Sequence, residues 1–364
     1  MFIGITGPIC SGKHSIAKWL VTTRGFTLLS LKGTEHYGFN ALHFNTPKDL
    51  LFYVTKNWID NFVTCDIDNH KILDLYRKRP FFLLLAVDSP ITMRYQRCIF
   101  RCREFGLTEP TLEEFIIAND QNLFNAIAPS NEFALSIAQQ QERETSMTSD
   151  EEDDYNTATS IYEIMSLADI CIANSYLSLP PLYSYLLNIN ITDPDRLRPT
   201  WDTYFMHLSD LAASRSNCMK RKVGCILVKN HRVIATGYNG TAKGLKNCNE
   251  GGCERCNDVM PCGKGLDSCL CLHAEENALL EAGKERVGVG CILYCNTCPC
   301  LGCSVKLIQV GVTEVVYHRS YGMDEKTSNL LKEAGVKLRQ HSPPSKISSL
   351  EKNDIISIEP MEQL

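Results

Sequence analysis

The sequence predicts an α/β protein made of two domains. Its 364 residues suit about two domains at roughly 150 residues each. Strand and helix signals alternate through residues 1–195, and a second alternating series runs through residues 199–341. Between the two series lies a short segment rich in proline and charge, Thr192–Thr200, which we interpret as the linker.

The composition is that of a globular protein without a general affinity for polyanions. Hydrophobic residues make up 44% of the chain and charged residues 22%. The net charge of -5 and the pI of about 6.0 give no basic bias toward nucleic acid or membranes. No apolar stretch reaches the roughly 18 residues that span a bilayer. The N-terminus enters a strand directly, without a signal or transit pattern. We therefore expect a cytoplasmic protein, with the nucleus as a second compartment.

The first domain begins with a strand, a glycine-rich turn and a helix. The strand is predicted at Phe2–Thr6 and the helix at Ser15–Thr22. The turn matches the phosphate-binding pattern G-x-x-x-x-G-K, which predicts Gly7, Gly12 and Lys13 as nucleotide-binding residues. His14 follows the lysine, where a serine or threonine would bind Mg²⁺.

Later elements of this domain fit the same class. Phe81–Val87 is predicted as a buried strand, the region around Arg94–Arg103 as a basic helix, and Ala168–Asn174 as a final strand. The acidic stretch 139–160 is predicted to be a disordered insertion. The domain resembles small nucleotide and dephospho-coenzyme A kinases. That resemblance implies a P-loop kinase-like fold, and we expect a degenerate domain that serves assembly or regulation.

The second domain opens with a helix and a hairpin. The helix is predicted at Asp202–Arg215 and the hairpin strands at Val223–Val228 and Val233–Gly237. A glycine- and cysteine-rich insertion follows. The last elements are predicted as a strand at Glu314–Tyr317, a helix at Asp324–Ala334 and a strand at Val336–Arg339, before a disordered tail at 342–364.

The chemistry is indicated by His273-Ala-Glu275, followed by Pro299-Cys300-Leu-Gly-Cys303. A helix is predicted at 273–282, ended by Gly283, then a buried strand at Val289–Tyr294 and a second helix opened by Pro299. One imidazole and two thiols suit zinc, and three protein ligands leave a fourth position for water. We therefore predict His273, Cys300 and Cys303 as zinc ligands and Glu275 as the group that moves protons. The pattern is similar to that of zinc-dependent nucleobase deaminases.

Cysteines are concentrated around this motif. Thirteen of the 18 lie between Cys218 and Cys303, a clustering that indicates metal ligands in a reducing compartment rather than a small disulfide scaffold. Within the insertion we predict a second, structural zinc and name Cys262 as a rival ligand; the expected set is Cys248, Cys253, Cys256 and Cys269. Cys271 and Cys218 are interpreted as buried or unpaired thiols.

Several segments closely resemble the deoxycytidylate (dCMP) deaminase family, most of all its fungal members with an N-terminal extension. The matching segments are 214–225, 235–240, 271–278 and 293–303. The resemblance implies a cytidine-deaminase-like α/β/α sandwich with a five-stranded mixed sheet. It also implies hydrolytic conversion of dCMP to dUMP and ammonia, which supplies thymidylate synthesis. A homo-oligomer, often a hexamer, is implied as well, activated by dCTP and inhibited by dTTP as allosteric ligands, with Mg²⁺.

Substrate contacts follow from the same resemblance and from charge. The resemblance implies that Asn239 contacts the sugar and that Tyr321 packs against the nucleotide. Ser214, Lys220 and Arg221 belong to the densest basic run of the domain, and a 5′-phosphate needs cations or N–H donors. We therefore predict these three residues as phosphate contacts.

Other functions are open at this point. Nucleoside deaminases usually have a cysteine where His273 stands, and editing of transfer RNA or DNA predicts a basic surface stripe that the net charge of -5 disfavours. A nucleotide kinase led by Lys13, alone or in a bifunctional protein, is a further alternative. A non-catalytic sensor fits least, because no ligand is missing and Glu275 is present.

Overall fold

The computed structural model describes residues 1–31, 40–125, 160–258, 264–320, 325–345 and 347–348. The chain divides into two compact units, and each is described by itself: unit 1 comprises residues 1–197 and 345–364, and unit 2 comprises residues 198–344. Among the described residues, no helix has both the length and the apolar character needed to cross a membrane.

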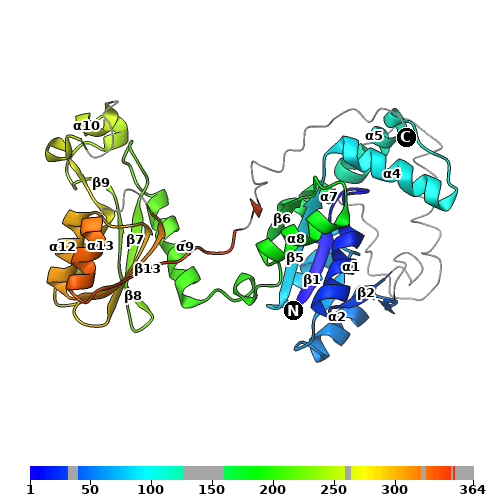
Figure 1. Ribbon diagram of the computed structural model, residues 1–364, viewed down its shortest axis with the longest axis horizontal. Coiled ribbons are helices and arrows are strands. Elements are labelled where there is room, and N and C mark those ends of the chain that lie inside the picture. The colour runs from blue at the N-terminus through cyan, green and yellow to red at the C-terminus, as the bar shows by residue number, and fades with distance from the viewer. Residues whose placement is uncertain (32–39, 126–159, 259–263, 321–324, 346, 349–364) are drawn as a thin grey trace. The chain divides into compact units, whose positions relative to one another are not determined.

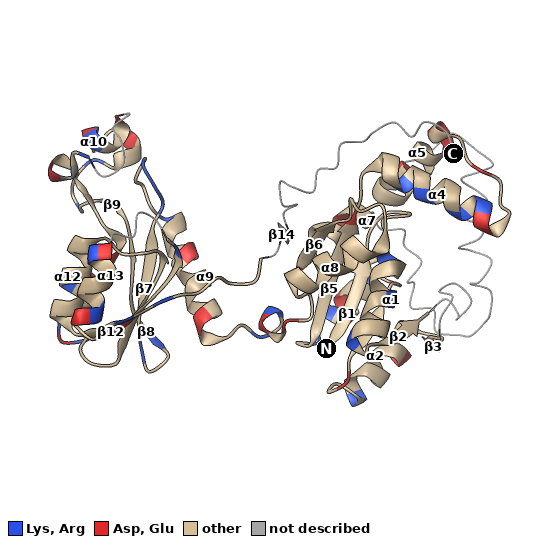
Figure 2. Cartoon of the chain, viewed as in Figure 1, with Lys and Arg blue, Asp and Glu red and all other residues tan. Residues whose placement is uncertain are grey.

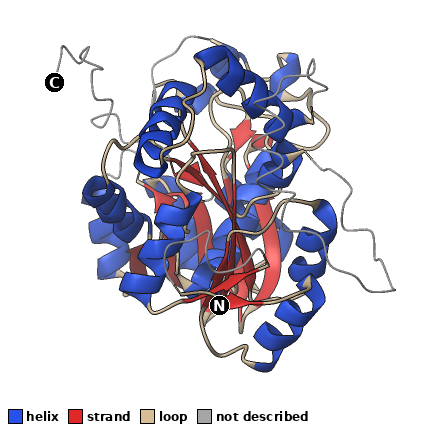
Figure 3. Cartoon of the chain, turned by 90° about the vertical axis from the view of Figure 1, so that its right-hand side faces the viewer, coloured by secondary structure: helices blue, strands red, loops and turns tan. Residues whose placement is uncertain are grey.

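Unit 1 is built around a parallel sheet. Its strand order is β14-β6-β5-β1-β4-β2-β3, and every pair is parallel. Helices lie on both sides of this sheet (Figure 3). The strands are β1 (Phe2–Thr6), β2 (Thr27–Ser30), β3 (Leu42–His43), β4 (Phe62–Thr64), β5 (Phe82–Asp88), β6 (Ile170–Ala173) and β14 (Ile347–Ser348). The helices are α1 (Lys13–Arg24), α2 (Pro47–Lys56), α3 (His70–Arg77), α4 (Ile91–Phe105), α5 (Leu112–Phe124), α7 (Ile161–Ser166), α8 (Leu179–Ile189) and the 3₁₀ helix η2 (Pro194–Arg196).

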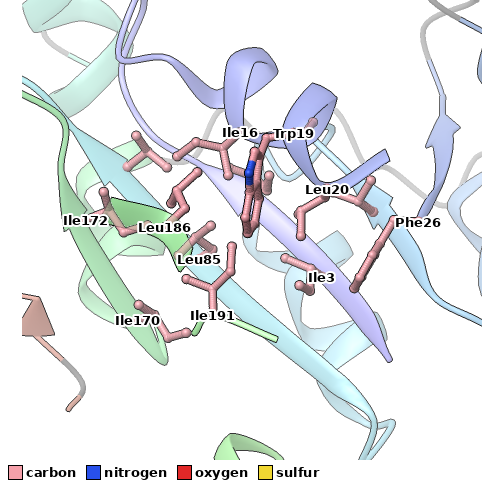
Figure 4. Packing of buried hydrophobic residues seen from close by; sticks show 14 of the residues in the cluster. Ile3, Ile16, Trp19, Leu20, Phe26, Leu85, Ile170, Ile172, Leu186 and Ile191 are labelled. Atoms are coloured by element: carbon pink, nitrogen blue, oxygen red, sulfur yellow. The ribbon is translucent and has the colours of Figure 1, made fainter. Parts of the chain in front are cut away.

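The central strands are buried on both faces, so they consist of continuous apolar residues without alternation. Every residue of β1 is buried, and so are the first six of β5. On one face, Ile3 and Leu85 pack against Trp19 of α1 and Leu186 of α8 (Figure 4). This double coverage explains why short apolar runs identified both strands in the sequence.

The predicted elements of unit 1 are present with shifted ends. The helix predicted from Ser15 begins at Lys13. The basic helix predicted around Arg94–Arg103 corresponds to α4, which extends beyond both of these residues. Residues 139–159 of the predicted insertion lie outside the described residues, while Ser160 caps α7. The prediction of a disordered tail from residue 342 differs from the structure at β14, where two residues gain backbone partners by pairing with β6.

Unit 2 contains a five-stranded mixed sheet in the order β13-β12-β11-β7-β8 (Figure 1). β11, β12 and β13 are parallel to one another, whereas β7 pairs antiparallel with both β11 and β8. The strands are β7 (Gly224–Lys229), β8 (Arg232–Tyr238), β11 (Cys291–Thr297), β12 (Val312–Arg319) and β13 (Lys337–Gln340), with a separate pair β9 (Gly240–Thr241) and β10 (Cys271–Leu272). The helices are α9 (Trp201–Ser214), α10 (Glu254–Asn257), α11 (Ala274–Ala282), α12 (Leu301–Val310), α13 (Glu325–Glu333), η3 (Cys248–Glu250) and η4 (Leu266–Ser268).

Alternate residues of β7 face two different cores. Leu227 belongs to the core beneath α11, α12 and α13, whereas Ile226 and Val228 belong to the core beneath α9. The sheet is therefore the middle layer of a three-layer unit. The predicted hairpin is confirmed: β7 and β8 are joined at Asn230 and His231, which have φ of 51° and 56°, as a tight two-residue turn requires.

Gly237 lets α11 approach the sheet closely. A Cβ atom at this position would lie 2.1 Å from the carbonyl oxygen of Ala274 and 2.7 Å from the backbone nitrogen of Ala278. Backbone atoms cannot rotate away as a side chain can. We expect Gly237→Ala to lower the free energy of unfolding by about 1–3 kcal/mol, as overpacking does in other cores, measured by urea denaturation.

Gly302 of α12 provides the matched control for this substitution. No atom outside its own helix backbone lies within 4 Å of its ideal Cβ position. Gly302→Ala should therefore keep or slightly raise the stability, because alanine is the better helix former. Equal destabilisation by both substitutions would contradict the close approach assigned to Gly237.

Charged residues lie mainly on helices and connecting loops (Figure 2), and Arg339 of β13 is an exception. Its guanidinium donates to both carboxylate oxygens of Asp202, at 2.6 and 2.8 Å, and to Glu314 at 2.5 Å. Tyr294 also donates to Asp202, at 2.8 Å. The hydrogen bonds from Arg339 hold the pKa of Asp202 below its ordinary value, ahead of burial, which acts the other way.

This lowered pKa gives a pH-dependent contribution to stability. The contribution is complete above the unfolded-state pKa of about 3.9 and is lost as the pH falls through the lower folded-state value. We expect Arg339→Met to lower the free energy of unfolding by about 1–2 kcal/mol at pH 7. The gap from the wild type should begin to shrink below about pH 4 and should disappear once the pH lies below the folded-state pKa of Asp202, in denaturation curves recorded from pH 7 into this acid range. A gap that is constant with pH would contradict this role of Asp202.

Candidate metal centre and active site

The motif residues lie at the N-termini of two helices. His273 is the N-cap of α11 and Cys300 is the N-cap of α12, so α12 begins at Leu301, two residues after the predicted opening at Pro299. The strand between them is β11, which starts at Cys291 rather than at the predicted Val289. Cys303 lies in the first turn of α12 and is buried. These caps place one imidazole and two thiols together.

The three side chains form a group with metal-ligand geometry. The Nδ1 atom of His273 lies 3.5 Å from the Cys300 sulfur and 3.3 Å from the Cys303 sulfur. All three ligand atoms lie within 4.8 Å of one another. Zinc–sulfur bonds of about 2.3 Å and zinc–nitrogen bonds of about 2.0 Å in a tetrahedron give edges of roughly 3.5 Å. The geometry therefore fits zinc, with one corner left over.

The ionisation of these groups also fits a cation. The Cys303 thiol and then the His273 imidazole lower the pKa of Cys300 to about 4. Cys300 in turn raises the pKa of Cys303, and it raises the pKa of His273 to about 9. Near neutral pH the group therefore holds protons on Cys303 and His273, and a divalent ion bound by two thiolates and a neutral imidazole would displace them. Such proton release accompanies metal binding to cysteine and histidine.

Glu275 is the acid of the site. It lies in the first turn of α11 and is only 4% exposed. Burial raises its pKa to about 7, against smaller opposing effects that include the charge of His273 and a hydrogen bond with Cys303. A carboxyl that titrates near neutral pH can both accept and donate a proton there. The arrangement places such a group beside the three candidate ligands.

The neighbouring Glu276 supports the ligand rather than the chemistry. Its carboxylate accepts a hydrogen bond of 2.8 Å from the backbone nitrogen of His273, which caps α11, and it forms an ion pair with Lys306 of α12. The two helices that carry the ligands are therefore linked to each other. Lys306 lies three residues after Cys303 and so outside the motif, which is why the motif did not indicate this link.

Asn239 fixes the loop between α9 and β7. Its side-chain oxygen accepts from Ser216 at 2.7 Å and from the backbone of Val223 at 2.8 Å, and its side-chain nitrogen donates to the carbonyl of Arg221 at 2.8 Å. It lies directly after β8, two residues beyond Gly237, which packs on the first turn of α11. The loop therefore lies close to the candidate centre. The predicted contact of Asn239 with a sugar stays a prediction.

The predicted phosphate contacts lie on or beside this loop. Ser214 ends α9 and donates to the carbonyl of Leu211 at 2.6 Å, and the Lys220 ammonium donates to the carbonyl of Asp258 at 3.3 Å. Arg221 follows Lys220 directly, shortly before the start of β7, and is half-buried. The three residues thus belong to one segment, and their contact with a phosphate stays a prediction. Tyr321, the other predicted substrate contact, lies outside the described residues.

The cysteines of the insertion gather differently from the prediction. The set Cys248, Cys253, Cys256 and Cys269 does not form one group, because Cys248 belongs to one cluster and Cys253 and Cys269 to another. The two clusters share two members. One consists of Cys218, Cys248, Cys256 and Cys271, and the other of Cys253, Cys256, Cys269 and Cys271. Cys218 and Cys271, interpreted from sequence as ordinary thiols, are thus within reach of a metal, while Cys262 lies outside the described residues.

The fold and the donor set define a class of protein. A mixed sheet with a histidine and a buried glutamate on one helix, and two cysteines on the next, is the arrangement of zinc-dependent deaminases of the nucleobase type. Residues 199–319 match the family described as "Cytidine and deoxycytidylate deaminase zinc-binding region".

Relatives extend the match to both units. A Schizosaccharomyces pombe protein named deoxycytidylate deaminase is 45% identical over 94% of this chain and 98% of its own length. A Saccharomyces cerevisiae protein of the same name is 40% identical over 94% of this chain and 97% of its own length. The chain belongs to the deoxycytidylate deaminase family. The two fungal proteins match over 94% of this chain, so their similarity extends to unit 1. The human protein of that name is 31% identical over only 39% of this chain.

A solved structure shows the same partial coverage. The dCMP deaminase from the cyanophage S-TIM5, in complex with dCMP and dUMP, is 31% identical to this chain. It covers 38% of this chain and 94% of its own chain, with a TM-score of 0.31.

Proposed function

We propose that this chain catalyses the hydrolytic deamination of dCMP to dUMP and ammonia and so supplies dUMP for thymidylate synthesis. The observation that carries the proposal is the group of His273, Cys300 and Cys303 beside a buried Glu275, in a chain that matches two fungal deoxycytidylate deaminases over 94% of its length. In this proposal His273, Cys300 and Cys303 hold zinc. A bound zinc ion supplies Lewis acidity, which lowers the pKa of water from about 15.7 toward 7.

Glu275 carries the proton transfers. Its buried carboxylate accepts a proton from the attacking water, whose oxygen forms a bond to C4 of cytosine. The same carboxyl gives this proton to N3, then takes the second proton from the hydroxyl group now bonded to C4 and gives it to the exocyclic amine. The bond between C4 and that amine breaks and ammonia leaves, so dCMP and water become dUMP and ammonia. A pKa of about 7 suits a group that must take up and release protons in one cycle.

The α9–β7 loop orients the nucleotide. Ser214, Lys220 and Arg221 bind the 5′-phosphate through charge and hydrogen bonds, and Asn239 holds this loop in place while it contacts the sugar. A nucleoside lacks the phosphate and so cannot make these contacts. This gives a physical reason for a monophosphate to be preferred over deoxycytidine.

The proposal is tested by ammonia release from the purified full chain. The substrates are dCMP, deoxycytidine, CMP and single-stranded DNA, each with and without dCTP or dTTP in the presence of Mg²⁺. We expect turnover of dCMP, raised by dCTP and lowered by dTTP, by a homo-oligomer of hexamer size in light scattering. Equal turnover of deoxycytidine or DNA would overturn the assignment of substrate and favour the nucleoside or nucleic-acid alternative.

Unit 1 supports a separate proposal, that of a P-loop kinase-like domain without phosphoryl transfer. Gly7 and Gly12 have φ of 149° and 103°, conformations suited to glycine, and α1 begins at Lys13 directly after the strand and turn. The Lys13 ammonium donates to the loop's own carbonyls, those of Gly7 at 2.6 Å and Pro8 at 2.9 Å. His14 also offers no hydroxyl for Mg²⁺. We infer a phosphate-loop fold that serves assembly or regulation.

This second proposal predicts that Mg-ATP is not turned over. ATP hydrolysis and phosphoryl transfer to nucleoside monophosphates should stay at background in the wild type and in Lys13→Ala alike. ATP turnover that disappears in Lys13→Ala would instead establish a bifunctional protein with nucleotide kinase activity.

A further inference from the structure

The six cysteines of the two clusters converge from well-separated positions in unit 2. They come from the loop after α9, from η3, from α10 and its N-cap, from the segment before β10, and from β10 itself. Four of them are buried and two are half-buried. In order along the chain they are Cys218, Cys248, Cys253, Cys256, Cys269 and Cys271.

Their spacing is neither that of disulfides nor that of loosely packed thiols. The sulfur of Cys256 lies 3.6 Å from that of Cys269, 3.8 Å from that of Cys218 and 3.9 Å from that of Cys271. The sulfurs of Cys253 and Cys269 lie 4.0 Å apart. A disulfide requires about 2.05 Å. Thiolates at about 2.3 Å from a tetrahedral zinc lie roughly 3.8 Å from one another. The observed distances are therefore those of sulfurs around a metal.

We propose that these six cysteines hold two zinc ions in a binuclear cluster with two bridging thiolates. Cys256 and Cys271 are the bridges, because they alone belong to both clusters. Each tetrahedral ion has four ligand positions. Four terminal thiolates each fill one position and the two bridging thiolates each fill one position on both ions, so every position is filled. The terminal ligands are Cys218 and Cys248 for one ion, and Cys253 and Cys269 for the other.

A single ion explains the arrangement less well. Either cluster alone would leave two cysteines of the other cluster without a metal, although their sulfurs lie at the same short distances. The set predicted from sequence fails for the same reason, since it takes members from both clusters. Sharing of Cys256 and Cys271 accounts for all six sulfurs at once.

Donors around the sulfurs suit thiolates. Backbone nitrogens donate to two terminal sulfurs, Met219 to Cys248 and Leu270 to Cys253, both at 3.4 Å. A nitrogen of the buried Arg255 guanidinium lies 4.0 Å from the sulfur of the proposed bridge Cys256. Two divalent ions and six thiolates leave a net charge of about -2, which such donors and a cation stabilise.

The cluster would join the deaminase site to the insertion. Cys218 lies in the loop that carries Lys220 and Arg221, and Cys271 opens β10, which leads directly to His273. Apart from these ties, the described residues of the insertion are held by short elements, a two-stranded ladder and hydrogen bonds such as that from Lys220 to Asp258. The two ions therefore replace a hydrophobic core that this segment is too small to form.

Zinc content of the full-length protein tests the proposal. We expect three zinc ions per chain, two in the cluster and one at His273, measured by elemental analysis against protein concentration. Cys256→Ser or Cys271→Ser should leave one ion. Cys303→Ser should leave two, which separates this site from the proposed active site. The exposed Cys171→Ser, in unit 1, is the control and should keep all three. Two ions in the wild type, or loss of only one with either bridge variant, would overturn the binuclear cluster.

A second measurement does not depend on the folding of any variant. In the cobalt-loaded wild type, thiolate bridges couple two Co²⁺ ions antiferromagnetically and remove their paramagnetic resonance signal. We expect the signal to integrate to one cobalt per chain although three are bound. A signal that accounts for every bound ion would exclude bridging.

Discussion

Replacement of Glu275 by glutamine is expected to lower kcat on dCMP by at least about 10² to 10⁴, the usual contribution of a positioned proton-transfer group. Glutamine has nearly the same shape but cannot take a proton from water or pass one to the leaving amine. Glu275 is 4% exposed, so no bulk water can easily take over its role. Ammonia release at saturating dCMP measures the loss, while KM should change little.

The control for this variant lies on the same helix. Glu281 is exposed on α11, and Glu281→Gln removes an equal charge away from the ligand group. It should keep the wild-type kcat. Glu275→Gln should also keep its zinc content, because the carboxylate is not among the three ligands. Near-normal turnover by Glu275→Gln with zinc bound would show that another group moves the protons.

The helix–strand–helix around the motif could be predicted because its signals are local. Gly283 ends α11 as expected, and the apolar run in front of Pro299 identified β11. The start of that strand was misplaced at Val289. This side chain is 82% exposed, and Gly290 has φ of 84°, so a turn occupies the predicted first residues. Hydrophobicity alone does not distinguish an exposed valine in a turn from the first residue of a strand.

Contacts between distant segments could not be predicted in the same way. Cys218 lies 38 residues before Cys256, yet their sulfurs are 3.8 Å apart. Sequence spacing therefore suggested the nearer set within the insertion. The hydrogen bonds of Asn239 were missed for a similar reason, since they depend on how the α9–β7 loop folds back on β8. In both cases the side-chain type was informative, but its partners are set by tertiary structure.

The catalytic metal group should be more sensitive than Glu275 to a single substitution. Cys303 is 1% exposed, and its sulfur lies 3.3 Å from Nδ1 of His273. Serine in its place offers a harder, weakly acidic oxygen, which binds zinc poorly in comparison with a thiolate. We expect Cys303→Ser to lose one zinc ion per chain and to lose at least about 10⁴ in kcat, because the proton-transfer and Lewis-acid contributions disappear together.

Cys298→Ser is the matched control for this prediction. Cys298 is also buried, five positions away in the sequence, but it belongs to none of the described metal-ligand groups. Its replacement makes the same chemical change and should keep both the zinc content and the turnover. If Cys298→Ser lost as much metal as Cys303→Ser, the loss would reflect damage to the fold. If Cys303→Ser kept its metal and its rate, the catalytic centre could not be built from these three ligands.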